Sequence, residues 1–195
     1  MMVYRKLIQP LDCKAIETDF DVLESSLYSG RQETASTKII FRKYGRIAVP
    51  PGIDIENYRT AIAAEFEHLR RSMINGTKQL KSIRSGFSQL NATVPDYKIS
   101  RAFYRRNLRP KIDKFEDYMG SAHTSVITIK RKIEDIRGFK KQLPAIEKGH
   151  LQEMYRLVMP SLIILDHLTE ACYWSGIALK RLLNHSMQQS AERLT

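Results

Sequence analysis

The chain has 195 residues, of which 43% are hydrophobic and 27% are charged, as in an ordinary folded domain. This composition argues against an intrinsically disordered chain, and no apolar run approaches the ~20 residues that a membrane span needs. Lysine and arginine number 32 against 21 acidic residues, which gives a net charge of +11 and favours a polyanionic partner.

The cysteines and the N-terminal residues suggest a compartment. Cys13 and Cys172 are far apart in the sequence, and no apolar segment typical of a signal peptide follows the first basic residues. We therefore expect reduced thiols and a cytoplasmic protein, one that can also lie at the periphery of a membrane.

The N-terminal part, residues 1–53, is predicted to be a unit of its own. Asp12 is a suitable cap for a short acidic helix whose apolar residues recur every three or four positions and end near Gly30. Residues 37–49 are rich in β-branched and aromatic side chains, which favours a small extended or β arm. The Pro50-Pro51 pair that follows would end that arm.

The remainder, residues 54–195, is predicted to be an all-α bundle. Heptad-like spacing predicts three long helices at about 54–94, 96–143 and 145–188. The clearest series is Leu108, Ile112, Phe115, Met119, Ala122, Val126, Ile129, Ile133, Ile136 and Leu143. Short connections marked by prolines predict that neighbouring helices are antiparallel. The alternative is a compact bundle of shorter helices, broken at Gly76, Pro110 and Gly120.

Three such helices enclose only a thin core. We therefore expect coiled-coil packing against a second copy, as a homodimer, or against another subunit of an assembly.

The positive charge is concentrated in residues 96–143, with 13 basic and 6 acidic side chains, an excess of seven. The first basic cluster is Lys98, Arg101, Arg105, Arg106, Arg109, Lys111 and Lys114. The second basic cluster is Lys130, Arg131, Lys132, Arg137, Lys140 and Lys141. Because a helix places them ~40 Å apart, an extended anionic surface could contact both clusters, whereas a compact ligand could not.

No pattern in the sequence predicts catalysis. Nucleotide-binding loops, zinc-protease motifs and C-x-x-C pairs are all absent. Two Glu-x-x-His patterns, at Glu65 and Glu147, have the spacing found in di-iron bundles. However, Glu65 and His68 flank the apolar series instead of lying on it. We predict a non-enzymatic protein without a metal or cofactor.

In its plan of three long helices with basic clusters along one rod, the chain over residues 54–188 resembles BAR-type membrane-curving modules. That resemblance implies an antiparallel dimer that presents a basic face to anionic lipid. The predicted function is a helical scaffold or adaptor that oligomerises and presents a basic face to an anionic membrane or an acidic partner. The alternative is a nucleic-acid-binding protein that uses the two basic clusters.

Overall fold

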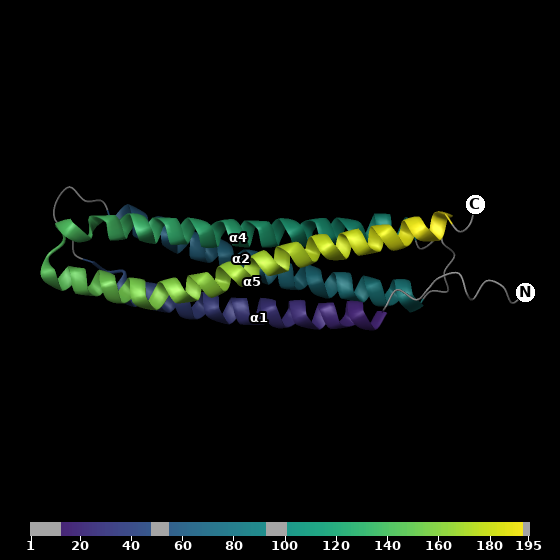
Figure 1. Cartoon of the computed structure of the whole chain (residues 1–195), viewed down its shortest axis with the longest axis horizontal. Helices are drawn as coiled ribbons and strands as arrows, with labels where there is room; N and C mark the ends of the chain where they lie inside the picture. Colours follow the sequence, from purple (N-terminus) through teal and green to yellow (C-terminus); the bar gives the residue numbers. More distant parts are fainter. Residues whose placement is uncertain (1–12, 48–54, 93–100, 193–195) are drawn as a thin grey trace, which may run out of the picture.

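The computed structural model describes residues 13–47, 55–92 and 101–192 of the chain. These residues form an antiparallel bundle of long helices (Figure 1). The long helices are α1 (Cys13–Tyr44), α2 (Ile55–Ala92), α4 (Arg109–Gly138) and α5 (Ala145–Glu192). A π-helical turn, η2 (Tyr104–Leu108), leads into α4, and a 3-10 turn, η3 (Phe139–Gln142), follows it. The predicted all-α class is confirmed for this part of the chain.

The four helices form a ring in which each packs on two neighbours: α1 on α2, α2 on α4, α4 on α5, and α5 on α1. The longest helix, α5, has 48 residues and therefore extends ~70 Å. The beginning of α1 and the end of α5 lie at one end of the bundle (Figure 1). The hairpin between α4 and α5 lies at the other, together with the end of α1.

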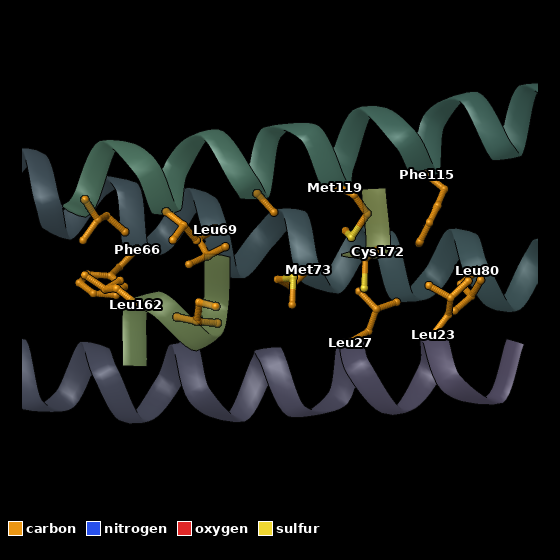
Figure 2. Packing of buried hydrophobic residues seen from close by; sticks show 14 of the residues in the cluster. Leu23, Leu27, Phe66, Leu69, Met73, Leu80, Phe115, Met119, Leu162 and Cys172 are labelled. Atoms are coloured by element: carbon orange, nitrogen blue, oxygen red, sulfur yellow. The ribbon is translucent and has the colours of Figure 1, made fainter. Parts of the chain in front are cut away.

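The apolar series predicted in residues 108–143 faces the bundle interior. All ten of its members are at most 3% exposed. They belong to one hydrophobic cluster to which every long helix contributes. Figure 2 shows Leu27 of α1, Phe66 of α2 and Phe115 of α4 pointing into this shared interior. The cluster joins α1 to the rest of the bundle in one core.

The N-terminal region differs from the sequence-based expectation. The predicted short helix with a β arm is wrong, because α1 continues through Gly30 and makes residues 37–44 helical. The buried residues of α1 keep a spacing of four and three throughout, at Ile16, Phe20, Leu23, Leu27, Gly30, Thr34, Thr37 and Phe41. Burial of this stripe against α2 and α5 outweighs the strand propensity of residues 37–44. The rest of the predicted arm, beyond Ile47, lies outside the described residues.

As a result, α1 is a fourth helix of the bundle. The three-helix plan that resembles BAR-type modules is therefore not what the chain adopts. The thin core that motivated self-association is filled by α1, from within the same chain. Oligomerisation accordingly stays a prediction.

The helices respond differently to Gly76, Pro110 and Gly120, the three positions at which the sequence could predict a break. α2 runs through Gly76 and α4 runs through Gly120, so the alternative with breaks at these glycines is wrong. At Pro110 the helix widens into η2, where the backbone N–H of Arg109 donates to the carbonyl of Tyr104. Proline crowds the carbonyl one turn before it, and a π-turn relieves that crowding without ending the helix.

Among the described helices, none combines the length and the apolar character that crossing a lipid bilayer would require.

Candidate functional site

The second basic cluster lies where α4 ends. Arg131, Arg137, Lys140 and Lys141 are exposed, while Lys130 and Lys132 are partly buried. Two of the six form ion pairs within the described part of the bundle, since Lys130 Nζ lies 2.6 Å from Asp166 Oδ2 and Arg137 lies 3.3 Å from Glu134. The guanidinium of Arg137 also stacks on the Tyr155 ring at 4.4 Å. The remaining members of the second cluster are available to an external partner.

The fold adds basic residues from two other helices to this end of the bundle. Arg42 and Lys43 are in the last turn of α1, and exposed Arg46 follows them. Lys148 is in the first turn of α5. We call Arg42, Lys43, Arg46, Lys140, Lys141 and Lys148 the basic end. In the described part of the chain, none of these six has a carboxylate within ion-pair distance.

Two nearby carboxylates pair with cations outside the basic end, whereas Glu147, beside Lys148 in the first turn of α5, has only His150, at 3.6 Å, as an ion-pair partner among the described residues. Glu153 lies 2.7 Å from Arg156, and Glu56 pairs with Arg59. Lys140 contacts only a neutral group, the side-chain oxygen of Gln152 at 3.4 Å. The basic end therefore keeps an excess of positive charge that the bundle itself does not use.

The first basic cluster lies at the opposite end of α4, ~50 Å from Lys140 and Lys141 of the basic end. Arg101, Arg105, Arg106, Arg109 and Lys114 are exposed, Lys111 is partly buried, and Lys98 lies outside the described residues. Acidic groups accompany this cluster: Arg109 Nε lies 3.9 Å from Asp113, which also pairs with Lys180 of α5 at 2.6 Å. The fold also brings exposed Lys78 and Lys81 of α2 and Arg181 of α5 to this half of the bundle, since Gly86 of α2 packs on Leu108 and Lys180 pairs with Asp113. The two predicted clusters therefore differ in the ion pairs that accompany the first one.

Between the two basic clusters, the surface of α4 is lined by small and hydroxyl-bearing residues. An open recess there is bordered by Gly120, Ser121, Thr124 and Thr128 of α4, with Tyr173 of α5 and His68 of α2 at its sides. Three carboxylates, those of Glu65, Glu116 and Asp117, also line it. The recess carries no lysine or arginine. It separates the two basic clusters instead of joining them.

The first Glu-x-x-His pattern takes part in a hydrogen-bond network in this region. Ser125 Oγ donates to Glu65 Oε2 at 2.9 Å and lies 2.9 Å from His68 Nδ1. Because the hydroxyl proton points to Glu65, Nδ1 of His68 must be the donor to Ser125. Ser125 is also 2% exposed. A serine that is buried, and that accepts a hydrogen bond from histidine instead of donating one to it, is not arranged for nucleophilic catalysis.

The second Glu-x-x-His pattern does not meet the first. Glu147 and His150 lie 3.6 Å from each other in the first two turns of α5, and α5 is diagonal to the helix that carries Glu65. Within the described residues, no three His, Cys, Asp or Glu side chains are placed to hold a metal ion.

Comparison with known proteins does not assign a class to the chain. No protein family matches it, and neither a curated protein nor a solved structure shows significant similarity to it.

Sequence reasoning found the second basic cluster but missed Arg42, Lys43, Arg46 and Lys148. Because the sequence predicts an extended arm for Arg42, Lys43 and Arg46, it does not predict their place beside the second cluster. The signal that could have found them is the unbroken apolar spacing of α1 across Gly30.

Proposed function

We propose that the chain is a non-enzymatic helical scaffold that attaches to a polyanionic surface through its basic end. One observation carries this proposal: three elements far apart in the sequence bring unpaired cations to the same end of a rigid rod. A field of like charges at one end would orient the rod as it approaches an anionic surface.

The helix dipole explains the position of only some cations of the basic end. Cations at the C-terminal end of a helix are stabilised by its dipole, which suits Arg42 and Lys43 of α1. Lys148 has the opposite placement, because it lies in the first turn of α5, where the helix dipole disfavours a cation. Stability of the bundle therefore does not explain Lys148, whereas a polyanionic partner does.

The scaffold role also includes binding of a protein partner or a second copy. The outward side of α5 exposes Ile163, Ile164, Trp174 and Leu182, each by 46 to 56%. Light scattering over a range of concentrations tests this part, since oligomerisation through α5 would raise the mass and a Trp174→Ser variant would reverse the increase.

The alternative function is nucleic-acid binding along α4. It is favoured by the first basic cluster, where exposed Arg105, Arg106 and Arg109 could contact phosphates. In that case both ends of α4 would contribute to affinity, because a duplex could extend along the whole helix.

Paired charge reversals at the two ends separate these functions. The Lys140→Glu/Lys141→Glu variant changes the basic end, and Arg105→Glu/Arg106→Glu applies the same change to exposed residues at the other end. The binding assay is sedimentation with vesicles containing phosphatidylserine at low salt, with circular dichroism to verify the fold.

The proposed function predicts a loss of affinity of at least about tenfold for the Lys140/Lys141 variant. The Arg105/Arg106 variant should bind nearly as the unaltered protein does. Equal losses in both variants, or binding of the unaltered protein to neither these vesicles nor heparin, would overturn the proposal. A gel shift with duplex DNA that depends on Arg105 and Arg106 would support the alternative instead.

A further inference from the structure

Next to the basic end, the α4–α5 hairpin carries a short apolar segment at its tip. Between η3 and the first turn of α5, the exposed residues Pro144, Ala145 and Ile146 follow one another. Ile146 is 74% exposed, more than any other large hydrophobic side chain described. We call these three residues the apolar tip.

The side chain of Ile146 is needed neither to start α5 nor to fill the core of the hairpin. The backbone N–H of Lys148 donates to the carbonyl of Pro144 at 2.9 Å, so the helix starts without help from the Ile146 side chain. The neighbouring core positions of this hairpin are filled by Leu143 and Leu151, which are 3% and 1% exposed. Ile146 therefore extends beyond the core instead of completing it.

The charge around the apolar tip selects the kind of surface that it fits. Lys140 and Lys141 precede it in η3, and partly buried Glu147 and then Lys148 follow it in the first turn of α5, so three lysines outnumber one carboxylate. An apolar side chain with an excess of lysines beside it suits the boundary between anionic lipid headgroups and acyl chains, since the side chain enters the apolar layer while the ammonium groups stay at the phosphates. A soluble polyanion would use the lysines but would gain nothing from an isoleucine.

We propose that the apolar tip inserts into the interface of an anionic lipid membrane, so that the bundle stands on its α4–α5 hairpin. This inference rests on the proposed function and names its partner as a lipid surface. The arrangement of the chain is consistent with it, because the described beginning of α1 and end of α5 lie at the far end of the rod (Figure 1). Those two ends would point away from the membrane.

A neutral substitution isolates the apolar contribution from the electrostatic one. Ile146→Asn removes the apolar side chain without changing the charge. Ile127→Asn is the matched control, because Ile127 is also an exposed isoleucine, is in the interior of a long helix, α4, and lies about 20 Å along that helix from Lys140. Each variant is measured against vesicles of phosphatidylcholine with phosphatidylserine, and against heparin as a soluble polyanion.

The inference predicts that Ile146→Asn weakens vesicle binding about tenfold while heparin binding is unchanged. Ile127→Asn should change neither. Unaltered vesicle binding by Ile146→Asn would overturn the insertion but leave the proposed function intact. Failure of the parent protein to bind either vesicles or heparin would overturn both.

Discussion

Gly30 of α1 lies directly against the Met73 side chain of α2, with no room for a Cβ atom between them. This contact lets α1 approach α2 closely in the middle of the bundle. We predict that Gly30→Leu destabilises the protein by about 1–3 kcal/mol, because the added side chain overpacks the core. The free energy of unfolding from urea denaturation measures the effect.

Gly149→Leu is the control for Gly30→Leu, because no atom lies within 4 Å of a Cβ placed at the exposed Gly149. It should leave the stability unchanged or raise it, since leucine favours helix. Equal destabilisation by both substitutions would contradict the close contact between α1 and α2.

The contact at Gly30 also shows which buried positions can be predicted from the sequence and which cannot. The apolar spacing of residues 108–143 predicted ten buried positions, because its phase is continuous and its side chains are large. In α1 the same phase continues through Gly30, Thr34 and Thr37, but these small or polar residues do not look like core positions in isolation. Their burial depends on a partner such as Met73, which only the fold supplies.

A similar limit applies to the candidate site. The second basic cluster could be predicted, since its lysines and arginines are close in sequence. The basic end could not, because Arg42, Lys140 and Lys148 belong to three elements whose ends meet only after the bundle forms. The widened turn before Pro110 also escaped prediction, since a π-turn has no distinct sequence pattern here.

Pro160 is exposed in the interior of α5, where it has no backbone N–H to donate. Pro160→Ala should restore that hydrogen bond and remove a steric conflict with the preceding turn. We expect stabilisation by about 1–3 kcal/mol, seen as a higher denaturation midpoint with an unchanged slope. A lower midpoint would indicate that α5 needs the proline for its path along the bundle.

Glu67 of α2 links the stability of the protein to pH. Hydrogen bonds from Arg70 and then Lys38 lower the pKa of Glu67 from 4.5 to about 2. A carboxyl whose folded-state pKa is depressed stabilises the fold above its unfolded pKa and loses that effect as the pH falls. The contribution of Glu67 should therefore be complete above pH 4.5 and disappear towards pH 2.

Carbon NMR of the Glu67 carboxyl group measures this pKa directly. Arg70→Ala should raise the pKa of Glu67 towards its ordinary value. Arg71→Ala is a weaker perturbation, because Arg71 lies 3.7 Å from Glu67 whereas Arg70 lies 2.6 Å away. A Glu67 pKa near 4.5 in the unaltered protein would contradict the hydrogen bonds that Arg70 and Lys38 donate to Glu67.

Cys172 of α5 is 1% exposed, and burial raises the pKa of its thiol to about 12. Only the thiolate reacts readily with disulfide reagents, so both its protonation and its inaccessibility should protect it. In a Cys13→Ser variant, Ellman's reagent should react with Cys172 orders of magnitude more slowly than with a free thiol. Addition of denaturant should restore full reactivity, and rapid reaction without denaturant would show that the core opens easily.

Attachment through the basic end is the central claim, and lysine labelling of the unaltered protein tests it most directly. Reductive methylation followed by mass spectrometry compares each lysine with and without anionic vesicles. We expect protection of Lys43, Lys140, Lys141 and Lys148, and unchanged labelling of Lys114, which is exposed at the opposite end. Protection of Lys114 to the same extent, or of no lysine at the basic end, would contradict the claim.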